Sequence, residues 1–98
     1  MKIITKKEEN ALTIELQGRL DTITFPELEA VLNTELDGME KLTIDCRYLE
    51  YISSAGLRVL LSAHKRMSAK GEMTLINVNE MVNEIFDITG FSDMLTIE

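Results

Sequence analysis

The chain has one cysteine, one histidine, one proline and no tryptophan among its 98 residues. With Cys46 as the only cysteine, no internal disulfide can form, and this favours a reducing cytoplasm as the compartment. Cys46 and the single histidine, His64, cannot build a His/Cys zinc site between them. This scarcity argues against an enzyme and against a metal or cofactor held by the chain itself.

Positive charge and long apolar runs are also scarce. Ten Lys and Arg against seventeen Asp and Glu give a net charge of −7, which argues against nucleic acid or an anionic membrane as the main partner. No apolar run approaches the roughly 18 residues that a membrane span needs, and residues 1–7 contain no signal-peptide core. The sequence therefore predicts a small, acidic, cytoplasmic domain without a small-molecule substrate.

The composition that remains is that of a globular protein. Hydrophobic residues make up 45 % of the chain and charged residues 28 %, so disorder is not expected. A chain of this length buries roughly 60–65 % of its unfolded surface, which supports one modest core and leaves little room for a deep cleft. Residues 1–98 are therefore expected to form a single domain.

Alternating hydrophobicity predicts the strands. Residues 11–18 alternate strictly, with Leu12, Ile14 and Leu16 on one face, and Gly18 closes the segment. A short β-capable stretch around residues 3–4 and a polar turn at 6–10 precede it, which suggests a hairpin. Further strands are predicted at residues 41–45 and 73–78 and, briefly, at 95–97, whereas residues 46–52 are expected to form a loop.

Three amphipathic segments with a period of about 3.6 predict helices. The first begins at Thr24, which has capping-box spacing to Glu27, with Pro26 in its first turn. The second follows residues 53–56, and Asn79 caps the third. Their ends are expected near Gly38, Gly71 and Gly90. The apolar stripe of the first helix consists of Leu28, Val31, Leu32 and Leu36, and that of the second consists of Leu57, Leu60, Leu61, His64 and Met67 or Ser68. The stripe of the third consists of Met81, Val82, Ile85 and Phe86. The order β-β-α-β-α-β-α-β predicts an α/β fold with right-handed crossovers.

Two segments follow strand ends, where the functional groups of α/β sheets collect: residues 19–22 and 52–58. In the second, Ser53 and Ser54 place two hydroxyls beside unpaired N–H groups at a helix start, and Gly56 would let another chain approach the backbone. One serine can be a simple N-cap, or a regulatory serine whose phosphate meets the helix-end donors. A nucleophile served by His64 is the third interpretation, although the Gly-x-Ser-x-Gly pattern is absent.

The same segment carries a resemblance to a known family. Residues 42–45, a seven-residue loop and residues 53–61 resemble the signature of STAS domains and, more narrowly, of bacterial anti-sigma factor antagonists. The upstream run Gly18-Arg19-Leu20-Asp21 is similar to that family's Gly-x-Leu-Asp, and residues 71–73 and 85–91 resemble its later elements. The resemblance covers nearly the whole chain and implies the STAS fold, a mixed sheet of four to five strands with helices packed on it.

The resemblance also implies roles for particular residues. When Gly56 is matched to the glycine of the family's Asp-Ser-Ser-Gly, Ser54 falls on the phosphorylated serine and Ser53 on the aspartate, with Ser53 as the second choice for phosphorylation. Asp21 corresponds to the acidic residue near that site, although a turn or cap role is at least as compatible with the sequence. The partner-binding residues implied by the family are Asp21, Ser53, Gly56, Leu57 and Arg58.

As a member of this family, the chain would be a phosphorylation-controlled binding module and not an enzyme. The unphosphorylated form would bind an anti-sigma factor that is also a serine kinase and so release a sigma factor, and a phosphoserine phosphatase would reverse the modification. Two alternatives remain. One is a STAS-type module in a stress-signalling scaffold or a transporter-associated assembly, and the other is a small hydrolase that uses Ser54 with His64.

Overall fold

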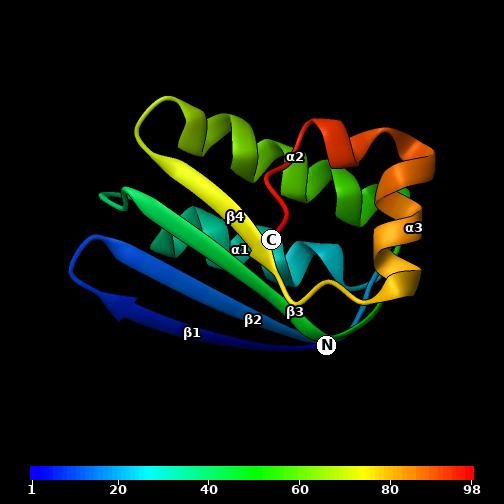
Figure 1. The fold of residues 1–98 in the computed structure, drawn as a ribbon. Helices are drawn as coiled ribbons and strands as arrows, with labels where there is room; N and C mark the ends of the chain where they lie inside the picture. The colour runs from blue at the N-terminus through cyan, green and yellow to red at the C-terminus, as the bar shows by residue number, and fades with distance from the viewer.

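The computed structural model describes residues 1–98 and shows a four-stranded sheet with three α-helices (Figure 1). The predicted α/β class is confirmed. In chain order the elements are β1 (Lys2–Glu8), β2 (Ala11–Leu20), α1 (Phe25–Glu35), β3 (Lys41–Ile52), α2 (Ser54–Ser68), β4 (Glu72–Ile76), α3 (Glu80–Thr89) and the 3₁₀ turn η1 (Phe91–Asp93).

The order of the strands in the sheet is the order of the sequence, β1-β2-β3-β4. β1 pairs with β2 as the predicted antiparallel hairpin, whereas β2, β3 and β4 are parallel. Each parallel crossover moves one strand further in the same direction, so right-handed connections bring α1 and α2 to the same face of the sheet. Figure 1 shows both helices on one side of the strands.

The core lies between that face and the helices. Leu12, Ile14 and Leu16 of β2 are buried there, as their alternation predicted, while the intervening residues of β2 are half-buried on the opposite face. Leu42 and Ile44 of β3 continue the same buried layer. Together with side chains from all three α-helices they form one cluster of 23 buried residues. A single core of this kind positions every helix relative to the sheet.

β3 is much longer than predicted, because residues 46–52 continue the strand instead of forming a loop. The register against β2 shifts twice, between Glu15 and Gln17 and between Gly18 and Arg19, and each shift inserts one extra residue into β3. The buried positions of β3 are therefore spaced by two and then by three residues: Ile44, Cys46, Leu49 and Ile52. The alternation that identifies a strand in the sequence is lost there.

The ends of the hairpin also differ from the prediction. Gly18 does not close β2; it lies inside the strand with φ +101°, next to the second register shift, and β2 runs on to Leu20. β1 continues through Glu8, so the turn consists of Glu9 and Asn10 only. Charged side chains are tolerated in β1 because it is the exposed edge strand of the sheet.

The predicted last strand is wrong. Residues 95–97 make only an isolated parallel bridge, between Leu75 of β4 and Ile97, supported by hydrogen bonds from Leu75 N–H to the Thr96 carbonyl and from Glu98 N–H to the Leu75 carbonyl, both of 2.8 Å. The residues before it form η1, which the sequence pattern did not indicate. β4 itself ends at Ile76, two residues earlier than predicted.

The helices begin and end close to the predicted positions, with two corrections to their buried faces. In α2, Val59 and Ala63 are buried while Leu61 and His64 are only half-buried, because the buried face runs through Leu57, Leu60, Ala63 and Met67 at helical spacings of three and four residues. In α3, Met81 is 58 % exposed. Asn79 caps α3 by accepting a hydrogen bond from the Val82 N–H at 2.8 Å, as expected.

Candidate functional site

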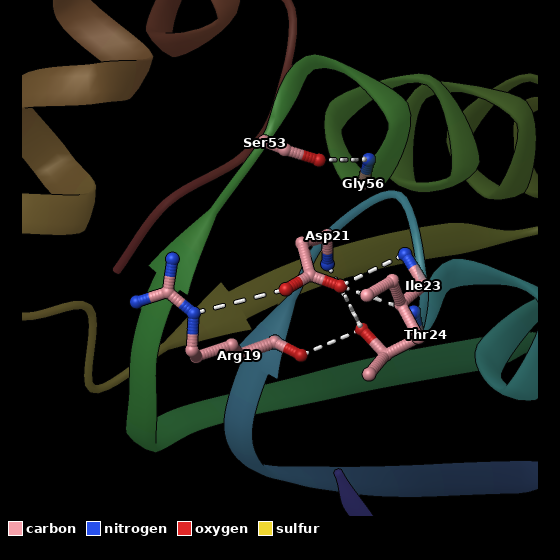
Figure 2. A network of polar contacts seen from close by, with 6 residues as sticks. All are labelled: Arg19, Asp21, Ile23, Thr24, Ser53 and Gly56. Atoms are coloured by element: carbon pink, nitrogen blue, oxygen red, sulfur yellow. Dashed lines mark hydrogen bonds and ion pairs between the residues drawn. The ribbon is translucent and has the colours of Figure 1, made fainter.

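The two segments singled out in the sequence meet at one edge of the sheet. β2 and β3 are parallel, and their last residues, Leu20 and Ile52, are paired in register. The Ser53 N–H donates to the Leu20 carbonyl at 2.9 Å, which fastens the start of α2 to the end of β2. Asp21 and Ser53 therefore follow neighbouring strand ends, and Figure 2 shows them on the same side of the molecule.

Ser53 is the N-cap of α2. Its backbone is extended (φ −96°, ψ 175°), its Oγ accepts a hydrogen bond from the Gly56 N–H at 3.4 Å, and its carbonyl accepts one from the Leu57 N–H at 2.9 Å. Figure 2 shows the hydrogen bond to Gly56, and Ser53 is half-buried. The structure thus gives the capping role, which the sequence left open between two serines, to Ser53.

Ser54 is the first residue of α2 and is exposed. Its hydroxyl takes part in none of the side-chain hydrogen bonds of this edge, which involve Ser53, Asp21 and Thr24 instead. At the first helical position its own N–H and that of Ala55 have no partner within the helix. Ser54 consequently presents an accessible hydroxyl beside two N–H donors and the positive end of the helix dipole.

Gly56 and Leu57 are buried, so the idea that they contact a partner directly needs correction. A Cβ on Gly56 would lie 2.7 Å from Leu20 Cγ, 2.9 Å from Ile52 Cγ1 and 2.9 Å from the Leu20 carbonyl oxygen. The close approach of the protein's own β2 to the helix explains why this position is a glycine. Leu57 is 4 % exposed and belongs to the core. Both residues hold the start of α2 in place, whereas Arg58 is exposed.

Asp21 organises the turn between β2 and α1. Its Oδ1 accepts hydrogen bonds from the N–H groups of Ile23 at 3.0 Å and Thr24 at 3.1 Å (Figure 2). These backbone donors, that of Thr24 first, hold the pKa of Asp21 below its ordinary value of 3.8, and the Thr24 hydroxyl and Arg19 add to the effect. Arg19 Nε lies 3.7 Å from Asp21 Oδ2, while its guanidinium stacks over Tyr51 at 4.4 Å.

Thr24 takes a different role from the predicted capping box. Its side chain makes no cap hydrogen bond to α1; the hydroxyl accepts from the Asp21 N–H at 2.9 Å and donates to the Arg19 carbonyl at 2.6 Å. The hydroxyl is engaged by the turn that precedes the helix, so it cannot reach the N–H groups of the first helical turn. An Asp followed by a Thr three residues later is the signal that could have indicated this turn.

A shallow hollow of about 260 Å³ lies between α1 and α2 beside Ser54. Its lining residues are Phe25, Glu29, Ala55, Arg58, Val59 and Ser62. Phe25 directly follows the turn that Asp21 organises, and Ala55 directly follows Ser54. Ala55 and Arg58 of the second predicted segment therefore line the hollow, and Phe25 brings it to within a few residues of the first segment.

Ser54 and His64, the pair that the hydrolase interpretation uses, are not brought together. His64 lies ten residues after Ser54 on the same helix, about 15 Å further along the axis at 1.5 Å per residue. It lines a separate hollow with Ser68, Gly71, Glu72, Met73 and Thr96. Cys46 is buried, and burial, with the nearby Asp45 charge, raises the pKa of its thiol to about 12. No group of three or more His, Cys, Asp or Glu side chains is placed to hold a metal ion, and no helix is long and apolar enough to cross a membrane.

Comparison with protein families supplies the deciding observation, because the model of the STAS domain matches residues 2–98. The chain belongs to the STAS domain family. Relatives of this STAS domain include BtrV of Bordetella bronchiseptica, named as an anti-sigma factor antagonist, with 35 % identity over 99 % of this chain and 85 % of BtrV. The anti-sigma-B factor antagonist of Staphylococcus aureus is 26 % identical over 99 % of this chain and 92 % of its own.

The fold of the STAS domain agrees with solved structures. SpoIIAA, an anti-sigma factor antagonist of Bacillus, matches in its unphosphorylated form with a TM-score of 0.78 over 99 % of this chain and 87 % of that chain. Its phosphorylated form matches with a TM-score of 0.77 over 99 % and 91 %. At 17 % identity these likenesses show the fold, and they confirm the predicted STAS architecture.

Proposed function

We propose that this STAS domain is an anti-sigma factor antagonist whose unphosphorylated form binds an anti-sigma factor and whose binding ends when Ser54 is phosphorylated. The observation that carries the proposal is the position of Ser54. It is an exposed hydroxyl at the first position of α2, on the surface that Asp21 and the hollow between α1 and α2 share. The names of the relatives, which match over nearly their whole length, support the same function.

Ser54 is a better phosphate acceptor than Ser53 for structural reasons. Ser53 Oγ is half-buried and accepts the Gly56 N–H, so a kinase would have to remove it from the cap before modifying it. Loss of an N-cap costs about 1 kcal/mol. The Ser54 hydroxyl has no such engagement, so phosphorylation there leaves the cap intact.

A phosphate on Ser54 is compatible with the folded domain. Its oxygens can accept hydrogen bonds from the N–H groups of Ser54 and Ala55 at the positive end of the 15-residue helix α2. The modification therefore changes the charge of the surface by about −1.5 to −2 without unfolding the helix. If the partner places carboxylates or apolar groups opposite, repulsion and desolvation cost a few kcal/mol, and 1.4 kcal/mol is already tenfold in affinity.

The partners that fit this cycle are an anti-sigma factor that is also a serine kinase, which supplies ATP and Mg²⁺, and a phosphoserine phosphatase. The domain itself would contribute only the acceptor hydroxyl and its surroundings, and its place would be the cytoplasm, where sigma factors act. The family carries an aspartate directly before its phosphorylated serine, whereas this chain has Ser53 at that position. A kinase that recognises this chain therefore cannot use a carboxylate at that position, because the neutral N-cap serine occupies it.

The test is phosphorylation of the full chain by the candidate kinase with ATP, followed by mapping of the phosphate by mass spectrometry. We expect one phosphate, on Ser54, and none in Ser54→Ala. Ser68→Ala is the matched control, because Ser68 is an exposed serine at the far end of the same helix, outside the hollow between α1 and α2, and should leave the labelling unchanged. Phosphate on Ser53 alone, or undiminished labelling of Ser54→Ala, contradicts the assignment.

A further inference from the structure

Ile23 is the most exposed large hydrophobic side chain of the protein. It is 86 % exposed, more than Ile88 of α3 at 78 % and Met81 at 58 %. Single exposed apolar residues are common on protein surfaces and need no explanation by themselves. Ile23 differs from the others in the way its backbone is held and in the surface to which it belongs.

The turn that presents Ile23 is fixed by hydrogen bonds on both sides of the residue. The Asp21 carboxylate accepts the N–H groups of Ile23 itself and of Thr24 (Figure 2). The Phe25 N–H donates to the Asp21 carbonyl at 2.9 Å, and the Thr24 hydroxyl ties the same turn to the Arg19 carbonyl. A loop held in this way loses little conformational entropy when it binds, so an apolar side chain on it can contribute most of its burial energy.

The turn also lies on the surface that carries Ser54. Phe25, two residues after Ile23, and Ala55, the residue after Ser54, line the same hollow between α1 and α2. The Ser53 N–H, one residue before Ser54, donates to the Leu20 carbonyl, three residues before Ile23, so the turn and the start of α2 are neighbours, whereas Ile88 lies near the end of α3. An apolar anchor on this turn would therefore lie beside the helix start that carries the residue proposed for phosphorylation.

We propose that Ile23 is the apolar anchor of the docking surface, inserted into an apolar hollow of the anti-sigma factor, and that Asp21 is a positioning residue that acts through it. This rests on the proposed antagonist function. Asp21 then contributes to binding by holding the backbone of the turn with its acceptor oxygen, and direct contact of its charge with the partner is not required. Asp21 and Ile23 then act together in binding: Asp21 fixes the backbone of the turn, and Ile23 makes the apolar contact with the partner.

The first experiment measures binding of the full chain to the purified anti-sigma factor loaded with ADP, so that no phosphate is transferred, by isothermal titration calorimetry. We expect Ile23→Ala to bind at least tenfold more weakly than wild type, which corresponds to about 1.4 kcal/mol. Ile88→Ala is the matched control, an equally truncated and similarly exposed isoleucine, and should bind like wild type. Equal affinities of Ile23→Ala and wild type would overturn the anchor while leaving the antagonist function standing; no binding by wild type would overturn both.

The second experiment is a double-mutant cycle for the positioning role. Asp21→Ala removes the acceptor of both backbone N–H groups and should weaken binding, whereas Asp21→Asn keeps an oxygen at that position and should retain most of it. In the Ile23→Ala background, Asp21→Ala should cost little more, because the residue that it positions is already truncated. Equal losses in both backgrounds would show that Asp21 contacts the partner on its own account.

Discussion

The close approach of α2 to β2 at Gly56 makes Gly56→Ala the sharpest perturbation of the site. The added methyl group would lie 2.7 Å from Leu20 Cγ and 2.9 Å from both Ile52 Cγ1 and the Leu20 carbonyl oxygen. A side-chain atom can move aside by rotation, but the carbonyl oxygen is part of the β2 backbone, and its neighbour, the Ser53 N–H, donates to it. The start of α2 must therefore move away from the sheet.

The size of the effect follows from two opposing terms. Overpacking a well-packed contact costs about 1–3 kcal/mol. Alanine in place of glycine stabilises a helix interior by up to about 1 kcal/mol, and by less in the first turn, where Gly56 lies. We expect a net loss of about 1–2 kcal/mol. At about 4–8 °C for each kcal/mol in a domain of this size, the melting temperature should fall by about 4–16 °C.

Thermal and urea unfolding followed by circular dichroism measures this loss. Ser54→Ala is the matched control, because it changes an exposed residue in the same turn and should remain within about 0.5 kcal/mol of wild type. If Gly56→Ala is as stable as wild type, the helix is not seated against Leu20 as described, and the explanation of why this position is a glycine is refuted.

Four further outcomes follow from the structure. Ser54→Asp should bind the anti-sigma factor at least tenfold more weakly than Ser54→Ala in titration calorimetry, because it adds negative charge at the start of α2; equal affinities would remove the electrostatic explanation. Cys46 should resist iodoacetamide at pH 8 in the folded protein and react once urea unfolds it, since burial raises its thiol pKa to about 12. The lowered pKa of Asp21 means that its stabilising contribution is fully present well above pH 3.8 and is lost as the pH falls below that value; the stability difference between wild type and Asp21→Asn, measured by urea unfolding, should therefore shrink as the pH is lowered below 3.8. Gly71→Ala should destabilise the fold more than Gly56→Ala does, because its Cβ would overlap the Glu40 carbonyl oxygen.

Regular patterns made the fold predictable, and irregular pairing made part of it unpredictable. The alternation of Leu12, Ile14 and Leu16 identified β2 because the extra residue at each register shift lies in β3, so the alternation along β2 itself is not interrupted. The second half of β3 was missed because Cys46 and Leu49 are three residues apart in the sequence yet point to the same side. That spacing depends on bulges opposite β2, a feature of the pairing of two strands that neither strand encodes alone.

The position of the candidate site was predictable from the sequence, but the roles of its individual residues were not. The strand ends and the paired serines indicated the edge of the sheet at which Asp21 and Ser53 meet, since parallel strands end together. Which serine caps the helix depends on the backbone of Ser53 and on the seating of Gly56 against Leu20, and both come from tertiary packing. Ile23 gave no signal at all, because an exposed isoleucine in a turn has no pattern around it until the hydrogen bonds of Asp21 are seen.

The same packing that fixes the core explains how a regulatory surface can change its charge without changing its shape. The hydrogen bonds that begin α2 come from Ser53 and from the Leu20 carbonyl, and the close contact comes from Gly56. None of these contacts uses the Ser54 side chain, so a phosphate on Ser54 would add charge without breaking any contact that holds the start of α2. Under the proposed function, binding would be controlled by repulsion at the surface and not by refolding, because the residues that build the helix start and the residue proposed to carry the phosphate are different residues.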